Sequence, residues 1–260
     1  MKCKLQRDTR DNLFLVLFVL PFLIVFTIFF LYPFFKGVIL SFTDWNGISP
    51  EYNFIWLKNY MDLFTKDERF INSLLITLIY TFAVVVISNI LGIALSLLIE
   101  HSGKMKNPLR VGFFLPYVFS LVVVGFSWKL IFTKVFPDLY KLTGWNFFDL
   151  DFLGDPQLAV VAVIAVSIWQ GLGYYLVIYI AGIQSIDSNI LEAADIDGAT
   201  GWKKFWNVTF PLLIPSVTIC VFTSIAGAFK VFDAVFVLTS GGPGYATVTI
   251  ALNIYNEAFG

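Results

Sequence analysis

Polar side chains set inside long apolar runs are the candidate functional residues of this 260-residue chain. Gln170 and Tyr174 stand four residues apart and so share one face of a helix, with Trp169 on the neighbouring face. Aromatic rings can stack on sugars, and amide and phenol groups can hydrogen-bond hydroxyls. This set therefore suits a neutral polyol, and hydrogen bonding between helices is the alternative role that stays open for each residue.

Two further polar pairs are candidates for contact with the same kind of solute. Ser88 and Asn89 are neighbours in an earlier apolar run and offer similar chemistry. Lys230 and Asp233 stand at i and i+3 near the end of another run, where they could pair with each other. An ionisable pair at membrane depth is a functional candidate by default, and a stabilising structural pair is an equally open interpretation.

The sequence offers no arrangement for covalent catalysis or metal binding. No nucleophile–base pair or paired carboxylate occurs inside the apolar runs, and the single histidine, His101, has no Cys or carboxylate at ligand spacing. The fragment nearest to a phosphate-binding loop is Gly103-Lys104, which lacks the upstream glycine and a following Ser or Thr. We therefore expect no enzyme activity, no metal and no ATP bound by such a loop.

The elements that must position these residues are membrane helices. The chain is 58% hydrophobic and 13% charged, whereas an average soluble protein is about 25% charged. A charge-free run of about 20 residues spans a bilayer. Five runs are complete: Leu13 to Phe35, Ile71 to Ile99, Val111 to Trp128, Gln157 to Ile186 and Val208 to Phe229. Thr247 to Asn256 begins a sixth, so the sequence predicts an all-α bundle of five transmembrane helices and the start of another.

Basic residues predict the orientation. They crowd the segment before the first run and the short loop after the second: Lys2, Lys4, Arg7, Arg10, Lys104, Lys106 and Arg110. The longer stretch from Lys36 to Phe70 carries only four. Under the positive-inside rule the N-terminus and the Lys104 loop are cytoplasmic, and further crossings return the segment around Glu192 to the same side. The first run exceeds 20 residues and ends in bulky residues, which favours an uncleaved helix over a signal peptide.

Small residues and prolines predict how the helices pack and bend. Ser88, Gly92 and Ser96 recur at four-residue spacing, which permits close approach of a neighbouring helix. Pro21, Pro33 and Pro116 are expected to kink or end their spans, because proline lacks the N–H that the helix ladder requires.

The polar segment between the fourth and fifth runs predicts a helix-turn-helix elbow on the inner face. Asn189, followed three residues later by Glu192, is a variant of the pattern that caps a helix start, and Gly198 can take a positive φ and end it. A helix of about seven residues is too short to persist alone, so it needs a surface to pack on. Ala193 and Ala194 have small side chains that let a partner approach the backbone closely.

A second short helix is expected after this one. Thr200 would cap it, Trp202, Phe205 and Trp206 would form one aromatic face against the inner ends of the membrane helices, and Pro211 would open the fifth span. An ordinary cytoplasmic connection with helical tendency is the alternative interpretation.

This loop resembles the EAA loop of the permeases of binding-protein-dependent ABC importers. The likeness rests on Glu192-Ala193-Ala194, Gly198, Val208 and Phe210-Pro211. The form seen in carbohydrate importers is matched by Asp197-Gly198-Ala199, Phe205, Pro211 and Pro215. A later part of the chain resembles the first membrane subunit of sugar and glycerol-3-phosphate importers, a group that includes the maltose-type permeases. The matching residues are Val231-Phe232-Asp233, Thr239 to Pro243, Thr247 and Tyr255 to Phe259. Motif-level likeness covers about residues 187–259, and upstream it rests on topology and on Asp44-Trp45 and Asn59-Tyr60.

The resemblance implies a single transmembrane permease domain over residues 1–260, with a cytoplasmic tail at 1–12 and a cytoplasmic coupling loop at 187–210. The residues that would couple to an ATPase are Glu192, Ala193, Ala194, Asp197, Gly198 and Ala199. The implied partners are a second permease, two ATPase subunits that bind ATP and Mg, an extracytoplasmic solute-binding protein, a sugar and membrane lipid, with no nucleic acid. The implied location is the cytoplasmic membrane of a bacterium or archaeon.

Two departures from the family pattern stand out. Val208 occupies a position where isoleucine is usual, and the chain stops at Gly260 inside the expected last span, so we expect a truncated sequence. A permease for peptides or amino acids, an ion-driven secondary transporter and a homodimer remain as alternatives. The secondary transporter is disfavoured because the spans lack central Asp or Glu.

Overall fold

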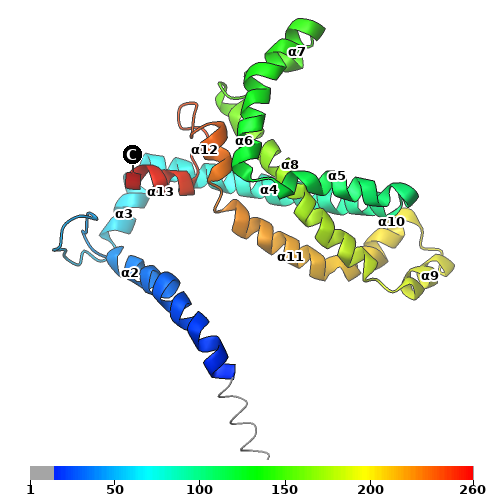
Figure 1. The fold of residues 1–260 in the computed structure, drawn as a ribbon, viewed down its shortest axis with the longest axis horizontal. Coiled ribbons are helices and arrows are strands. Elements are labelled where there is room, and N and C mark those ends of the chain that lie inside the picture. The colour runs from blue at the N-terminus through cyan, green and yellow to red at the C-terminus, as the bar shows by residue number, and fades with distance from the viewer. Residues whose placement is uncertain (1–14, 260) are drawn as a thin grey trace, which may run out of the picture. The chain divides into compact units, whose positions relative to one another are not determined.

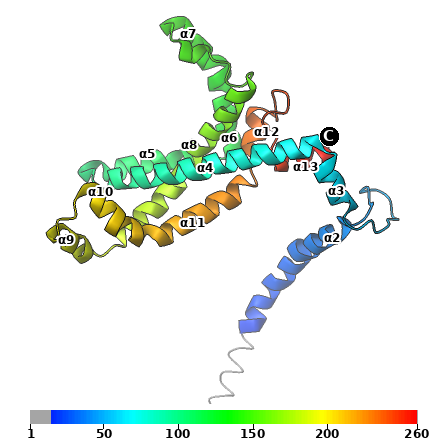
Figure 2. The same ribbon diagram turned by 180° about the vertical axis from the view of Figure 1, so that it is seen from behind.

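The computed structural model describes residues 15–259, and the described chain is helical with one isolated bridge between Thr43 and Phe54. The predicted tail at 1–12 lies outside these residues. Two compact units divide the chain, the first ending at Glu68 and the second beginning at Arg69. Figures 1 and 2 show the ribbon from opposite sides, and each unit is described by itself.

The first unit contains one long apolar helix and a polar loop. The helix runs over Leu15–Leu40 and includes the π-turn η1 (Thr27–Leu31) and α2 (Tyr32–Leu40); α3 (Lys58–Thr65) follows the loop. In the loop, Asp44 Oδ1 accepts a 2.6 Å hydrogen bond from the Asn53 N–H, and this bond lowers the pKa of Asp44. Asn59 Nδ2 donates to the Thr43 carbonyl at 2.8 Å. The two side chains hold the loop in one conformation.

The second unit is a bundle of helices in which one pair is sharply bent. Its long helices are α4 (Glu68–Glu100), α5 (Lys106–Val118), α8 (Pro156–Gln184) and α11 (Phe210–Ala228). Its shorter elements are η2 (Gly103–Met105), α6 (Leu121–Leu130), η3 (Ile131–Val135), α7 (Phe136–Thr143), η4 (Asn146–Asp149), α9 (Ser188–Ile196), α10 (Gly201–Lys204), η5 (Phe205–Thr209), α12 (Asp233–Leu238) and α13 (Ile250–Phe259). In both views α9 and α10 lie at one end of the bundle, and α12 and α13 lie toward the other.

Four helices in the described residues are long and apolar enough to cross a membrane. They are Leu15–Leu40, Glu68–Glu100, Pro156–Gln184 and Gly201–Ala228. A bent pair, Gly103–Val118 with Leu121–Thr143, makes a fifth if it counts as one span. The apolar pattern therefore predicted the helical class and the positions of four spans.

The third predicted span, Val111 to Trp128, is not one continuous helix. Its two parts meet at 95°, with Phe119 and Ser120 in extended conformation between them. Pro116 contributes to the break because its missing N–H leaves the carbonyl of Gly112 without a helical partner. The prediction that Pro116 would kink or end its span is thus consistent with the break, which falls three residues later.

Three prolines are accommodated without breaking their helices. Pro33, Pro137 and Pro211 each stand at the second residue after a π-turn, namely η1, η3 and η5. The proline ring would clash with the carbonyl four residues earlier, and a widened turn relieves that clash. Pro211 lies in the first turn of α11, as predicted, but the helix continues back through η5 to Gly201, so α11 is not the start of the span.

The core of the second unit forms around α8. Ser88, Gly92 and Ser96 are all buried on one face of α4, and a Cβ at Gly92 would lie 3.0 Å from the Tyr179 ring. On the other side of α8, a Cβ at Gly173 would lie 2.7 Å from the carbonyl oxygen of Phe113. Small residues thus set the distance from α8 to α4 and α5, which confirms the packing role predicted for the α4 stripe.

Candidate functional site: a polar cavity and an exposed elbow

A cavity of about 250 Å³ opens beside α8, lined from α4, α5, α8 and the segment that leads from α11 into α12. Its polar lining consists of Tyr80, Tyr117, Ser167, Gln170, Tyr174, Tyr175, Ser224, Lys230 and Asp233. Tyr117 and Tyr174 pack with ring centroids 5.4 Å apart, and Tyr174 and Tyr175 do the same. The cavity therefore has an aromatic wall that carries hydroxyl groups.

Four residues that the sequence singled out line this cavity: Gln170, Tyr174, Lys230 and Asp233. Gln170 is nearly buried, and its Nε2 lies 3.5 Å from the carbonyl oxygen of Phe119. That carbonyl belongs to the break between α5 and α6, where no helical N–H follows to pair with it. Gln170 thus connects the cavity wall to the broken span.

Lys230 and Asp233 do not form the structural ion pair that was one of their two open interpretations. Among the described residues no salt bridge joins them, and both side chains are exposed at the cavity. The prediction assumed that the helix continues to Asp233, but α11 ends at Ala228 and α12 begins at Asp233. The intervening turn removes the i and i+3 relationship that would have brought the two charges together.

The remaining three candidates lie outside this cavity. Asn89 Oδ1 accepts a 2.5 Å hydrogen bond from Tyr179 OH, and Asn89 Nδ2 donates to Ser224 Oγ at 3.2 Å, so Asn89 joins α4, α8 and α11. Ser88 Oγ is buried and has no hydrogen-bond partner within residues 15–259. Trp169 lines a separate apolar pocket against α5 and packs on Trp128.

Sequence reasoning missed several residues of the cavity. Ser167 and Gly171 share the helical face of Gln170 and Tyr174, since the four stand at spacings of three and four. That spacing could have identified Ser167. The contributions of Tyr80 and Tyr117 depend on how α4 and α5 pack against α8, which the local pattern does not encode.

The second candidate site is the elbow, in which α9 begins and ends with defined caps. Asp187, rather than the predicted Asn189, is the N-cap: its carboxylate accepts a 2.9 Å hydrogen bond from the Asn189 N–H. Either residue type can cap, and the chain begins its helical turn two residues earlier than the spacing to Glu192 suggested. The Glu192 side chain is exposed.

Gly198 ends α9 as predicted. Its φ is +78°, its N–H donates to the Asp195 carbonyl at 3.1 Å, and the next N–H, of Ala199, donates to the Ala194 carbonyl at 2.9 Å. These two bonds are the Schellman arrangement, which needs a residue with positive φ at this position. An added Cβ at Gly198 would meet nothing within 4 Å, so the requirement for glycine comes from the backbone and not from packing in this chain.

One of the three predicted coupling alanines, Ala194, faces inward. Ala193 is exposed, but Ala194 is buried, so Ala194 supports the elbow from within and is not available to a partner as expected. In contrast, Ile196 is 86% exposed on the same short helix. The exposed side chains toward the end of α9 thus include Glu192, Ala193, Ile196 and Asp197. The large apolar side chain of Ile196 was not singled out from the sequence.

The elbow is held by an ion pair and an aromatic cluster. Lys204 Nζ lies 2.7 Å from Asp195 Oδ1 and 2.8 Å from Oδ2, which ties the second arm to α9. Trp202, Phe205 and Trp206 pack on one another as predicted, although Trp202 is 74% exposed and is not seated against the bundle. Thr200 stands at the N-cap position, but within the described chain its side chain makes no capping bond.

Comparison with known proteins places these features in context. Residues 7–260 match the family model described as "Binding-protein-dependent transport system inner membrane component". A probable starch degradation products transport system permease protein, AmyD of Thermoanaerobacterium thermosulfurigenes, is 39% identical over 252 residues, which cover 96% of this chain and 85% of that protein. The multiple sugar-binding transport system permease protein MsmF of Streptococcus mutans is 36% identical over 93% of this chain and 83% of that protein.

A solved structure shares the fold. The crystal structure of a bacterial ABC transporter involved in the import of the acidic polysaccharide alginate contains a chain that superposes with a TM-score of 0.81. The match covers 98% of this chain and 87% of that one, at 23% sequence identity.

Proposed function

The chain belongs to the family of binding-protein-dependent transport system inner membrane components, and from this premise we propose that it is the permease subunit of an ATP-driven importer of a sugar or related polyol. Two relatives above 30% identity are named as permeases for starch degradation products and multiple sugars. The cavity beside α8 supports the same substrate class.

The single observation that carries the proposal of a neutral sugar is the composition of this cavity. Tyr117 and Tyr174 offer ring faces for stacking, and Gln170 offers an amide for hydroxyl groups. Lys230 and Asp233 balance each other in charge, so the lining carries no excess positive charge for an anionic sugar. The elbow lies at the other side of the bundle from α12, so solute contact and energy input act at separate places.

The elbow is proposed to dock on a separate ATPase subunit. Toward the end of α9, Glu192, Ala193, Ile196 and Asp197 offer a large apolar side chain beside two carboxylates, and Ile190 and Trp202 are exposed nearby, which fits a cleft with an apolar floor and a basic rim. Gly198 would fix the end of α9, and Ala194 and Ala199 would support it. ATP and Mg bind to the partner ATPase and not to this chain in the proposal.

The proposed assembly contains two permeases and two ATPases, with an extracytoplasmic solute-binding protein that delivers the sugar. The N-terminus and the elbow face the cytoplasm, and the segment around α12 faces the outside. The basic residues Lys104, Lys106 and Arg110 beside the inner end of α4 favour this orientation.

The experiment that tests the proposal is purification of the chain from its native membrane in mild detergent, followed by identification of the proteins that elute with it. We expect a nucleotide-hydrolysing subunit and a second permease at fixed stoichiometry. A chain that elutes without either, and whose preparation binds no sugar, would contradict the proposal.

A further inference from the structure

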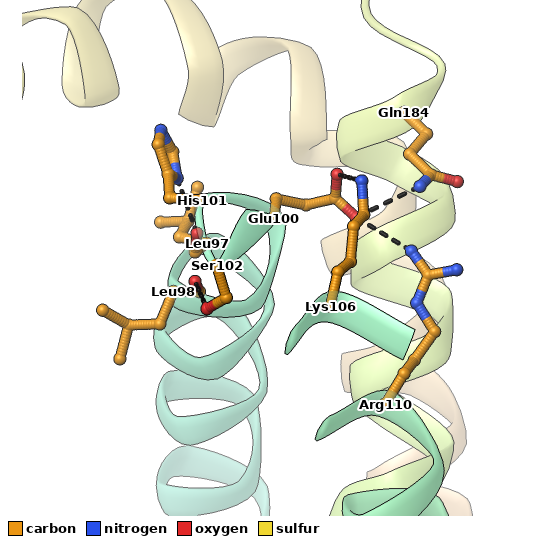
Figure 3. A network of polar contacts seen from close by, with 8 residues as sticks. All are labelled: Leu97, Leu98, Glu100, His101, Ser102, Lys106, Arg110 and Gln184. Atoms are coloured by element: carbon orange, nitrogen blue, oxygen red, sulfur yellow. Dashed lines mark hydrogen bonds and ion pairs between the residues drawn. The ribbon is translucent and has the colours of Figure 1, made fainter. Parts of the chain in front are cut away.

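A buried carboxylate ties three helices together at the end of the bundle that carries the elbow (Figure 3). Glu100, the last residue of α4, has a side chain that is only 12% exposed. Its Oε2 pairs with Lys106 Nζ, and its Oε1 accepts hydrogen bonds from an Arg110 guanidinium nitrogen at 2.9 Å and from Gln184 Nε2 at 3.1 Å. Lys106 and Arg110 belong to α5, and Gln184 is the last residue of α8.

Glu100, Lys106, Arg110 and Gln184 together form what we call the Glu100 node. Two of its charged residues lie at helix ends where the helix dipole disfavours their charge. Glu100 lies at the C-terminus of α4, where a negative charge is disfavoured, and Lys106 lies at the N-terminus of α5, where a positive charge is disfavoured. Arg110 Nε is also buried without a hydrogen-bond partner among residues 15–259. The positive-inside rule favours Lys106 and Arg110 at this end of the bundle, and pairing with them offsets the unfavourable position of Glu100 at the C-terminus of α4.

Gln184 stands at the root of the elbow. Asp187, the cap of α9, follows it by three residues, and α9 begins at Ser188. The bond from Gln184 to Glu100 therefore links the end of α8 to the hairpin formed by α4 and α5. This link lies only a few residues before α9 along the chain. A hydrogen bond to an ionised acceptor is stronger than a neutral one, and it holds the end of α8 in place.

We propose that Gln184 is a positioning residue for energy coupling. Gln184 acts through its hydrogen bond to Glu100, so that a movement of α9 moves α4, α5 and α8 together as one body. This inference rests on the proposed function, in which α9 receives its movement from an ATPase. Without the link, the short connection between Gln184 and Asp187 absorbs part of the movement, and ATP is hydrolysed with less solute transported.

The test is the Gln184→Met variant in the complete importer, reconstituted with its ATPases, second permease and binding protein. Methionine keeps the length and removes the donor. The number of sugar molecules transported per ATP hydrolysed is expected to fall about fivefold, which corresponds to about 1 kcal/mol, the net contribution of a typical hydrogen bond. Gln157→Met at the opposite end of α8 is the matched control and keeps the wild-type ratio, because its side chain is exposed like that of Gln184 but makes no hydrogen bond to another described residue.

An exchange variant separates positioning from general stability. Glu100→Gln combined with Gln184→Glu preserves one amide, one carboxylate and the net charge of the node, and we expect it to recover most of the transport-to-ATP ratio that Gln184→Met loses. This variant also decides the question if Gln184→Met fails to assemble. An unchanged ratio in Gln184→Met, or no recovery in the exchange variant, overturns the inference.

Failure of this inference can be told from failure of the proposed function. Gly198→Glu on α9 is measured in parallel, because it addresses the elbow and leaves the Glu100 node intact. If Gly198→Glu abolishes transport while Gln184→Met does not, only the positioning role is overturned. If neither substitution changes transport, the coupling function of the elbow is itself contradicted.

Discussion

The backbone N–H of Ala199 donates a 2.9 Å hydrogen bond to the carbonyl of Ala194, across the left-handed residue Gly198. This bond closes the end of α9 and directs the chain toward the second arm of the elbow. Because α9 has only nine residues, its persistence depends on such caps and on tertiary support more than on helix propensity.

The two neighbouring alanines of α9 are expected to respond differently to enlargement. Ala194→Leu forces a larger side chain into a buried position, at a cost of about 1–3 kcal/mol, and should loosen the elbow in the isolated chain. Ala193→Leu adds volume at an exposed position, so it should leave the elbow folded and weaken ATPase binding only. Hydrogen exchange of residues 188–199, with and without the ATPase, measures both effects. Equal protection in the two variants would contradict the assignment of inner and outer faces.

Substitutions of Gly198 test whether its role lies in the backbone and at the partner surface. Gly198→Glu should leave the protein in the membrane, because no atom lies within 4 Å of an added Cβ, but it should abolish uptake. A bulky residue in the left-handed region costs about 1–2 kcal/mol, and asparagine adopts that region more readily. Gly198→Asn should therefore retain much of the uptake. Membrane level by immunoblot and uptake of labelled sugar are the measurements, and normal uptake by Gly198→Glu would count against the account.

The cavity beside α8 should determine the affinity for solute. Tyr174→Leu and Gln170→Leu each remove one polar group from the lining, and we expect each to raise the half-saturating solute concentration about fivefold, which corresponds to about 1 kcal/mol. Trp169→Leu on the neighbouring face serves as control, with a change within about twofold, because that residue lies in the apolar pocket against α5. A larger effect from Trp169 than from Tyr174 would mean that the solute path lies elsewhere.

The loop of the first unit should loosen in acid. The backbone N–H of Asn53 bonds to the Asp44 carboxylate and lowers the pKa of Asp44 from 3.8. Since the folded-state pKa is the lower one, the ionised carboxylate stabilises the loop above pH 3.8, and this contribution is lost as the pH falls through the lowered pKa. Hydrogen exchange of residues 41–57, corrected for its intrinsic pH dependence, should show the loss, and Asp44→Asn should remove the pH response.

Sequence reasoning predicted the spans whose patterns are local. Charge-free runs longer than 20 residues identified α4 and α8 to within three residues at each end, because few other structures satisfy such a run. The end of α9 at Gly198 and the positive φ of Gly198 were also predictable, since glycine at a helix end can adopt a left-handed conformation.

The features that were missed depend on tertiary packing. Pro116 indicated a break in the third span but not its position at Phe119. The carbonyl of Phe119 accepts a hydrogen bond from Gln170, which lies on another helix 51 residues away. The burial of Ala194 and the separation of Lys230 from Asp233 follow from how helices end and pack. Hydrophobic periodicity carries no information on either.

In the proposed function, this permease takes its driving force from a separate ATPase through the elbow. The most direct measurement is solute accumulation in proteoliposomes that contain the chain alone or the chain with its second permease, ATPases and binding protein. We expect ATP-dependent accumulation of a neutral sugar in the complete assembly and none with the chain alone, with or without a proton or sodium gradient. Accumulation by the chain alone on an ion gradient would contradict the claim.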